Sequence, residues 1–206
     1  MQQLTSTNPS PAAPGETTVP APRVVRQMSV GATSMAEREV TLPDGRVRTG
    51  RPFVHRPPFV GVVPLRPGNT PGSAPEVLLV DQYRDAVGEV VREIPAGKIE
   101  PHELNEDPRQ VAARELAEET GLVAHRWQPL IGGVLPSPGF TDEIARGLWA
   151  AWEFELGTRR VEDAHIHGTW FPLSDALSQI GTQVRDAKTI IALLLTERRW
   201  QDWPLS

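Results

Sequence analysis

The feature that most constrains this sequence is a short helix with well-marked ends. Asp107 is a good N-cap residue, Pro108 suits the first helical position, and Gln110 stands where a capping-box partner would. Gly121 favours the left-handed backbone conformation that commonly ends a helix. The sequence therefore predicts a helix between Asp107 and Gly121.

Three glutamates crowd one side of this predicted helix. At about 100° per residue, Glu115, Glu118 and Glu119 fall within about 100° of arc. Like charges on one helix face cost stability, so packing alone gives no reason for the arrangement. Mg²⁺ binds carboxylate oxygens and keeps water and substrate phosphates in its coordination shell, so a bound cation would offset the repulsion. This face is a candidate metal site.

Together with an upstream glycine, the segment resembles the signature of the Nudix hydrolases. That signature is Gly, five residues, Glu, seven residues, then Arg-Glu-apolar-any-Glu-Glu-any-Gly-apolar, and Gly97 and residues 114–122 match it. The interval between the two matches is three residues longer than the signature allows. Glu103 keeps the spacing from the glycine, and Glu106 keeps the spacing to Arg114. We favour Glu106 as the first glutamate, with the insertion looped out before the helix.

The resemblance implies an α/β fold, the Nudix α/β/α sandwich with a mixed sheet, and the rest of the chain fits this plan. Apolar and β-branched runs predict strands, and periodic apolar residues predict two later helices. A mixed sheet flanked by helices gives three layers. The predicted strands are 59–65, 76–83, 90–94, 127–134, 145–156 and 169–173, and the helices are 174–180, with Ser174 as N-cap, and 186–200.

The chain divides into three parts. Residues 1–22 are rich in Pro, Ala, Ser and Thr with little apolar bulk, which predicts a disordered tail. Residues 23–57 predict a small antiparallel β subdomain with a hairpin at Asp44-Gly45. Such a sheet buries little by itself, so we expect it to pack on the main domain or on a second subunit, and the resemblance implies a homodimer. Residues 58–206 form the predicted Nudix hydrolase domain.

Composition excludes several classes of function. The net charge of −5 argues against a general nucleic-acid binder, which needs a basic face. No stretch approaches the ~20 apolar residues that cross a bilayer, so we expect no membrane segment. The sequence has no cysteine, which rules out disulfides and thiolate zinc sites within this chain. These features fit a cytoplasmic protein.

Three further segments resemble the ADP-ribose pyrophosphatases among the Nudix hydrolases. Residues 93–97 read Glu-Ile-Pro-Ala-Gly, as at the start of the signature in those enzymes, and residues 82–84 read Gln-Tyr-Arg. Residues 136–143 resemble their catalytic loop, and Pro138 stands where they carry a marker proline. The likeness covers roughly residues 40–197.

The resemblance also implies a metal site. Glu115 and Glu119 are the expected main ligands, and their i,i+4 spacing points both side chains the same way. Glu118 is the expected third side-chain ligand, and the backbone carbonyl of Ala96 is expected to add a further oxygen. The implied cofactor is Mg²⁺, with Mn²⁺ as an alternative, at two or three ions per site.

Two catalytic roles follow. Arg114 suits the orientation of carboxylates by bidentate pairing, with Glu106 and Glu118 as its expected partners. Glu143 lies on the proline-rich loop and is the expected general base, because a mobile loop can bring a carboxylate to the attacking water.

The expected reaction is hydrolysis of ADP-ribose to AMP and ribose 5-phosphate, a nucleoside diphosphate sugar being the substrate. Arg84, Glu93 and Pro138 are the candidate substrate-binding residues. The signature would be the same in an enzyme acting on GDP-mannose, another sugar nucleotide or FAD. A non-catalytic ADP-ribose sensor is a further alternative, although such proteins tend to lose the carboxylates that this helix retains.

Overall fold

The computed structural model describes residues 21–70, 72–157 and 166–204. The chain separates into two compact units, one reaching Val54 and one beginning at His55. Except for its last two residues, the tail predicted at residues 1–22 lies outside the described part of the chain. No helix in that part is long and apolar enough to cross a membrane.

The smaller unit is a three-stranded sheet. Its strands are β1 (Arg23–Val30), β2 (Thr33–Thr41) and β3 (Val47–His55), in that order across the sheet. β1 and β2 pair antiparallel. At the predicted hairpin the Arg46 amide donates to the Asp44 carboxylate over 3.0 Å, and Gly45 adopts a φ of 81° that most side chains disfavour. The expected small β-sheet is therefore confirmed.

The larger unit is built on a mixed sheet with the strand order β10-β5-β4-β9-β8, to which β6 adds beside β5 and β7 beside β4. β4 and β9 run parallel, whereas the other pairings are antiparallel. The strands are β4 (Phe59–Arg66), β5 (Glu76–Arg84), β6 (Glu89–Glu93), β7 (Ala96–Lys98), β8 (Leu122–Ile131), β9 (Ala145–Leu156) and β10 (His167–Pro172).

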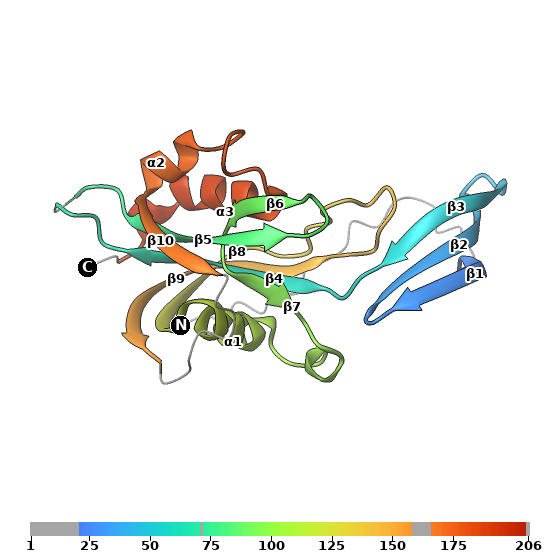
Figure 1. Ribbon diagram of the computed structural model, residues 1–206, viewed down its shortest axis with the longest axis horizontal. Helices are drawn as coiled ribbons and strands as arrows, with labels where there is room; N and C mark the ends of the chain where they lie inside the picture. Colours follow the sequence, from blue (N-terminus) through green and yellow to red (C-terminus); the bar gives the residue numbers. More distant parts are fainter. Residues whose placement is uncertain (1–20, 71, 158–165, 205–206) are drawn as a thin grey trace, which may run out of the picture. The chain divides into compact units, whose positions relative to one another are not determined.

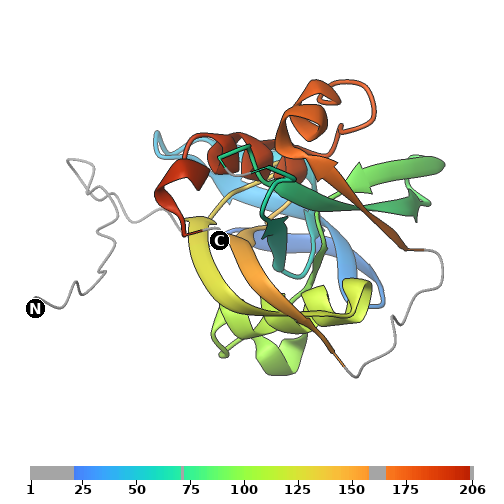
Figure 2. The same ribbon diagram turned by 90° about the vertical axis from the view of Figure 1, so that its left-hand side faces the viewer.

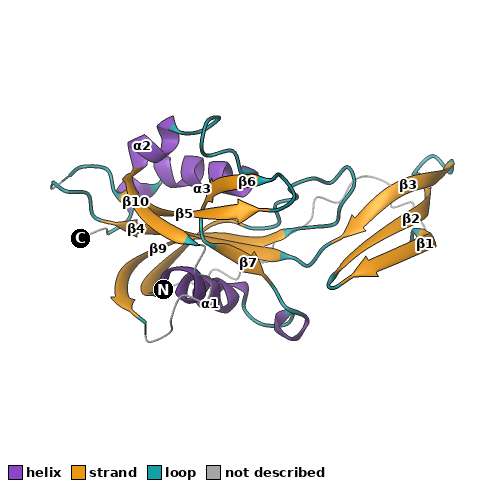
Figure 3. Ribbon diagram, viewed as in Figure 1, coloured by secondary structure: helices purple, strands orange, loops and turns teal. Residues whose placement is uncertain are grey.

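Helices cover both faces of this sheet. Figures 1 and 2 show α1 on one face and α2 and α3 on the other, and Figure 3 shows the resulting layers of helix, strand and helix. The predicted α/β/α arrangement with a mixed sheet is confirmed. The α-helices are α1 (Pro108–Thr120), α2 (Leu173–Ser178) and α3 (Ala187–Glu197), and short 3₁₀ turns span Pro101–Glu103 and Trp200–Asp202.

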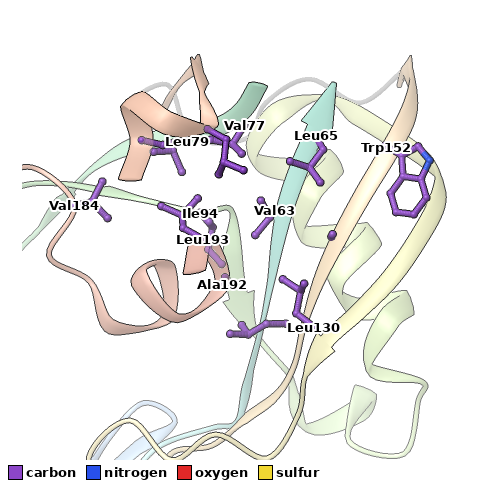
Figure 4. Packing of buried hydrophobic residues seen from close by; sticks show 14 of the residues in the cluster. Val63, Leu65, Val77, Leu79, Ile94, Leu130, Trp152, Val184, Ala192 and Leu193 are labelled. Atoms are coloured by element: carbon purple, nitrogen blue, oxygen red, sulfur yellow. The ribbon is translucent and has the colours of Figure 1, made fainter. Parts of the chain in front are cut away.

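The two faces carry separate cores because successive side chains of a strand point to opposite sides. On β4, Val63 and Leu65 belong to the core beneath α2 and α3, and Val60 and Val62 belong to the core beneath α1. Figure 4 shows the first of these cores, with Leu193 of α3 facing the strand side chains. Burial of both faces explains why β4 reads as a continuous apolar run.

The ends of α1 match the prediction. The Asp107 side chain accepts from the Arg109 amide over 2.9 Å, and Gly121 has a φ of 72° with its own amide bonded to Ala117 O. Because Gly121 reverses the chain at once, β8 begins at Leu122, five residues before the predicted start at residue 127.

The start of α2 differs from the prediction. The N-cap position is Pro172, without a side-chain cap, so the assignment of Ser174 as N-cap is wrong. Ser174 already lies inside the helix, and its hydroxyl bonds the neighbouring Asp175 side chain over 3.3 Å instead. Pro172 is also the last residue of β10, so the strand leads straight into the helix.

Two adjacent leucines of α3 test this core. Leu193 is fully buried beneath the helix, whereas Leu194 is 48 % exposed. We expect Leu193→Ala to lower the free energy of unfolding by about 2–5 kcal/mol, because it opens a cavity in the core. Leu194→Ala is the matched control and should cost much less. Urea unfolding measures both, and equal losses in the two variants would contradict the packing described.

Candidate active site

Most of the predicted site residues line one cavity of about 610 Å³ in the larger unit. Its walls come from β5, β6, β7, α1, the start of α3 and the loop between β8 and β9. Glu118, Arg114 and Pro138 do not line it. Pro138 is exposed on the loop, and Pro136 contributes to the wall instead. The predicted residues that line the cavity are Arg84, Glu93, Ala96, Glu115, Glu119 and Glu143.

Arg114 binds three carboxylates at once. Its Nη1 donates to Glu118 Oε2 over 2.6 Å, and its Nη2 lies 2.8 Å from Glu115 Oε1. Its Nε and Nη2 donate to the two carboxylate oxygens of Glu103 over 2.7 and 3.0 Å. Burial lowers the pKa of the guanidinium, but these carboxylates outweigh burial and raise that pKa above its usual value. Arg114 therefore stays charged and fixes the acidic face of α1.

The choice of Glu106 as the first glutamate of the signature is wrong by this geometry. Arg114 pairs with Glu103, which is only 5 % exposed, whereas Glu106 is exposed and makes no contact with Arg114. Glu103 also accepts from the Glu100 amide over 2.9 Å. Burial raises the pKa of Glu103, but Arg114 and this amide outweigh burial and lower that pKa. The extra residues lie after Glu103, where a turn leads to the start of α1.

The carboxylate of Glu115 needs the glycine at position 97. A Cβ built on Gly97 would lie 1.9 Å from Glu115 Cδ and 2.0 Å from Oε2, which is far inside contact distance. Gly97 lies on β7, the strand that pairs with the start of β4. The signature glycine thus leaves the space that the carboxylate fills.

Glu119 lies next to this carboxylate and is held by the same strand. Its Oε2 accepts from the Ala96 amide over 3.0 Å. Burial raises the pKa of Glu119 to about 7, helped by the charge of Glu115 and opposed by the Ala96 amide. Burial likewise raises the pKa of Glu115. Both side chains therefore ionise at a cost that a nearby cation would remove.

The donor set fits Mg²⁺ only if other ligands complete it. Within the described ranges, no three His, Asp or Glu side chains converge on one point suited to a metal ion. Arg114 draws Glu118 out of the cavity, which leaves Glu115 and Glu119 facing it. Mg²⁺ is commonly held by one or two carboxylates together with water and substrate phosphates. Two partly buried carboxylates with raised pKa values suit that mode of binding.

A charge network around the buried Glu93 forms another wall of the cavity. Arg84 donates to both oxygens of Glu93 over 2.7 and 2.6 Å, and Lys188 binds Glu93 as well. Lys188 Nζ also lies 3.0 Å from Asp186, the N-cap residue of α3. Burial raises the pKa of Glu93, but Arg84 and Lys188 outweigh burial and lower that pKa. The sequence analysis placed Lys188 only within the helix predicted at residues 186–200, so it missed this role.

Glu143 faces the same cavity from the loop before β9. Its Oε1 lies 3.0 Å from Arg56 Nε, and 19 % of its side chain is exposed. Arg56 precedes β4 and also lines the cavity. Nothing in the sequence near Arg56 signalled this role, because the contact joins segments 87 residues apart.

Comparison with known proteins supports the resemblance to the Nudix hydrolases. Residues 55–194 match the NUDIX domain family. A methanol dehydrogenase activator of Bacillus methanolicus is 35 % identical over 161 residues, which are 75 % of this chain and 80 % of that protein. An ADP-ribose pyrophosphatase of Bacillus subtilis is 34 % identical over 158 residues, 75 % of this chain and 80 % of that protein.

Two further matches agree with these. An ADP-ribose pyrophosphatase of Mycobacterium tuberculosis is 33 % identical over 144 residues, 69 % of this chain and 65 % of that protein. A crystal structure of an ADP compounds hydrolase superposes with a TM-score of 0.70 at 16 % identity, covering 92 % of this chain and 99 % of that one, which shows a shared fold. The resemblance drawn from residues 97–122 is thus confirmed, and the chain belongs to the Nudix family and is a Nudix hydrolase.

Proposed function

We propose that this enzyme hydrolyses the pyrophosphate of ADP-ribose to AMP and ribose 5-phosphate with a divalent cation, Mg²⁺ or Mn²⁺. Nudix enzymes act on nucleoside diphosphate derivatives and generally use divalent metals. The observation that carries the proposal is one cavity lined both by the acidic pair Glu115 and Glu119 and by the cations Arg84 and Lys188. Two relatives named as ADP-ribose pyrophosphatases support the choice of substrate.

The acidic pair suits the binding of a pyrophosphate through a cation. Glu115 and Glu119 would hold it, with the Ala96 carbonyl and substrate oxygens as further ligands. A bound Mg²⁺ ion neutralises phosphate charge, polarises the P–O bonds and lowers the pKa of water. Arg114 holds Glu115 in place through the contact at 2.8 Å, so the ligand oxygens need little rearrangement. Glu118 is the third proposed side-chain ligand, and its Oε2 is paired with Arg114.

Arg84, Glu93 and Lys188 would bind the nucleotide side of the substrate. Glu93 holds both cations at fixed positions, and their side chains line the cavity. A guanidinium presents parallel N–H donors that match phosphate or ribose oxygens. Pro138 is part of the proposal as a residue that shapes the loop over bound substrate.

Glu143 would act as the general base. The water oxygen forms a bond to one phosphorus atom, its proton passes to the Glu143 carboxylate, and the bridging P–O bond breaks to give two phosphate monoesters. A positioned base of this kind typically contributes about 10²–10⁴-fold to the rate.

Identity to relatives does not fix the substrate, because one relative of similar identity is named a methanol dehydrogenase activator. GDP-mannose, other sugar nucleotides and FAD remain alternative substrates for the same site. A non-catalytic sensor is disfavoured because Glu115, Glu118 and Glu119 are all present on α1. A cytoplasmic location is part of the same proposal and is compatible with the cysteine-free composition.

A homodimer formed through the smaller unit is also proposed. β1 is an edge strand of the three-stranded sheet, and apolar side chains on both of its faces are exposed. Burial of this surface in a second copy would stabilise a sheet that is too small to be stable alone. The exposed fractions are 46 % for Val24, 51 % for Val25, 62 % for Met28 and 77 % for Val30.

A substrate panel tests the proposed activity. With Mg²⁺ or Mn²⁺ present, we expect ADP-ribose to be hydrolysed with a higher kcat/KM than GDP-mannose, other sugar nucleotides or FAD. Chromatography should show AMP and ribose 5-phosphate in equal amounts, because only the pyrophosphate linkage breaks. Faster hydrolysis of another nucleotide would reassign the substrate within the Nudix class, and no hydrolysis of any of them would remove the enzyme proposal.

The acidic pair is tested by Glu119→Gln, with Glu106→Gln as the control on the same stretch of chain. Glu119 faces the cavity, whereas Glu106 is exposed away from Arg114. We expect Glu119→Gln to abolish metal-dependent turnover, because a neutral amide oxygen binds a divalent cation more weakly than a carboxylate does. The circular dichroism spectrum should be unchanged. Glu106→Gln should keep normal turnover. Near-normal activity of Glu119→Gln would take that residue out of the ligand set.

Sedimentation velocity tests the dimer. We expect the intact chain to sediment as a dimer, and Met28→Glu to shift it toward monomer by placing a charge on the exposed apolar surface of β1. Leu194→Glu, which alters an exposed leucine of the larger unit, should leave the dimer intact. A monomeric intact chain would refute this part of the proposal.

A further inference from the structure

The segment that precedes β4 is bonded to the loop that carries Glu143. His55 Nδ1 lies 2.7 Å from Asp142 Oδ2, and the Arg56 amide donates to Asp142 Oδ1 over 3.2 Å. Next along both segments, Arg56 Nε lies 3.0 Å from Glu143 Oε1. Residues 55–56 thus bind residues 142–143 through three contacts. All four residues belong to the unit that begins at His55.

Backbone contacts fix the same stretch of the loop. The Phe59 amide donates to Ile144 O over 3.0 Å, where the parallel pairing of β4 and β9 begins. On the other side of Asp142, the hydroxyl of Thr141, which is 7 % exposed, accepts from the Glu143 amide over 3.1 Å. The backbone at Glu143 is therefore held close to the beginning of β4 and β9, and the Glu143 side chain is the part that needs a further restraint.

Arg56 supplies that restraint. Arg56 contacts one carboxylate oxygen of Glu143, Oε1. The other oxygen, Oε2, is then the one that can accept a proton from the attacking water. A single exposed ion pair contributes little, because ordering two long side chains costs entropy. Here the Arg56 backbone is fixed by Asp142, which in turn is bonded to His55, so only the two side chains remain to be ordered when the ion pair forms.

We propose that Arg56 is a positioning residue for Glu143 and that the His55–Asp142 contact anchors it. The proposal rests on the function given above, in which Glu143 takes a proton from the attacking water. Without the ion pair the carboxylate samples other rotamers on an exposed loop, and misplacement by about 1 Å can cost on the order of 10²-fold in rate. Arg56 therefore acts on the chemical step through Glu143, and substrate binding is largely unaffected by its loss.

A double-mutant cycle tests this inference. The variants are Arg56→Ala, Glu143→Gln and the two combined, assayed with the nucleotide that the intact enzyme hydrolyses fastest, so that a different substrate does not obscure the result. We expect Arg56→Ala to lower kcat by about 10- to 100-fold with KM changed less than about 2-fold. In the Glu143→Gln background the same substitution should change kcat less than about 2-fold, because the group it positions is already gone.

Two further variants separate positioning from general loss of structure. Arg56→Lys keeps the charge and should restore part of the lost kcat, whereas a purely structural role would not respond to this change. Arg126→Ala is the control. It removes an exposed ion pair at 3.1 Å between Arg126 of β8 and Glu153 of β9, and it should leave kcat unchanged. Thermal unfolding of each variant confirms that it is folded.

The outcomes are distinct. If Arg56→Ala lowers kcat equally in the intact enzyme and in Glu143→Gln, Arg56 acts on the substrate itself. If Arg56→Ala leaves kcat unchanged, Arg56 has no role in the chemical step. Either result overturns the inference. Full activity of Glu143→Gln would place the base elsewhere and overturn the inference together with that assignment. The proposed substrate would stand in all of these cases, because the panel alone decides it.

Discussion

The rest of the site depends on the ion pairs that Arg114 forms with three carboxylates. α1 presents Glu115, Glu118 and Glu119 on one side, and their mutual repulsion would drive the side chains apart. One partly buried guanidinium binds the first two and also holds Glu103 of the preceding turn. This division leaves Glu119 with an amide as its partner and a pKa raised to about 7. Arg114 therefore pairs with Glu115 and Glu118, while Glu115 and Glu119 are the two carboxylates of α1 that face the cavity.

The three-layer fold brings the two walls of the cavity together. α1 packs on one face of the sheet and α3 on the other, so the acidic pair and Lys188 approach from opposite layers. The segment between β6 and β7 joins them. The Ile94 amide donates to Thr189 of α3 over 2.9 Å, and two residues later the Ala96 amide donates to Glu119 of α1 over 3.0 Å. A short stretch of backbone thus fixes both helices relative to the cavity.

Local signals in the sequence were sufficient for the elements that carry the site. The caps of α1 and the apolar run of β4 each depend on a few neighbouring residues. Gly97 was marked only by the resemblance to the signature, and the structure supplies its physical reason in the Glu115 side chain. The choice between Glu103 and Glu106 failed because counting residues cannot tell on which side of a glutamate an insertion lies. That choice depends on β7, which fixes the path from Gly97, and on which carboxylate Arg114 reaches. Lys188 and Arg56 were missed because their partners lie 95 and 87 residues away.

The central claim is that Glu115 and Glu119 form a cation site, and manganese binding measured by electron paramagnetic resonance tests it most directly. Mn²⁺ loses its signal when bound, so the bound fraction can be followed as the pH changes. Because burial raises the pKa of Glu119 to about 7, protons compete with the cation below that pH. The account predicts binding that tightens as the pH rises through about 7, both with and without ADP-ribose. Absence of bound Mn²⁺ at every pH, even with the nucleotide present, would contradict it.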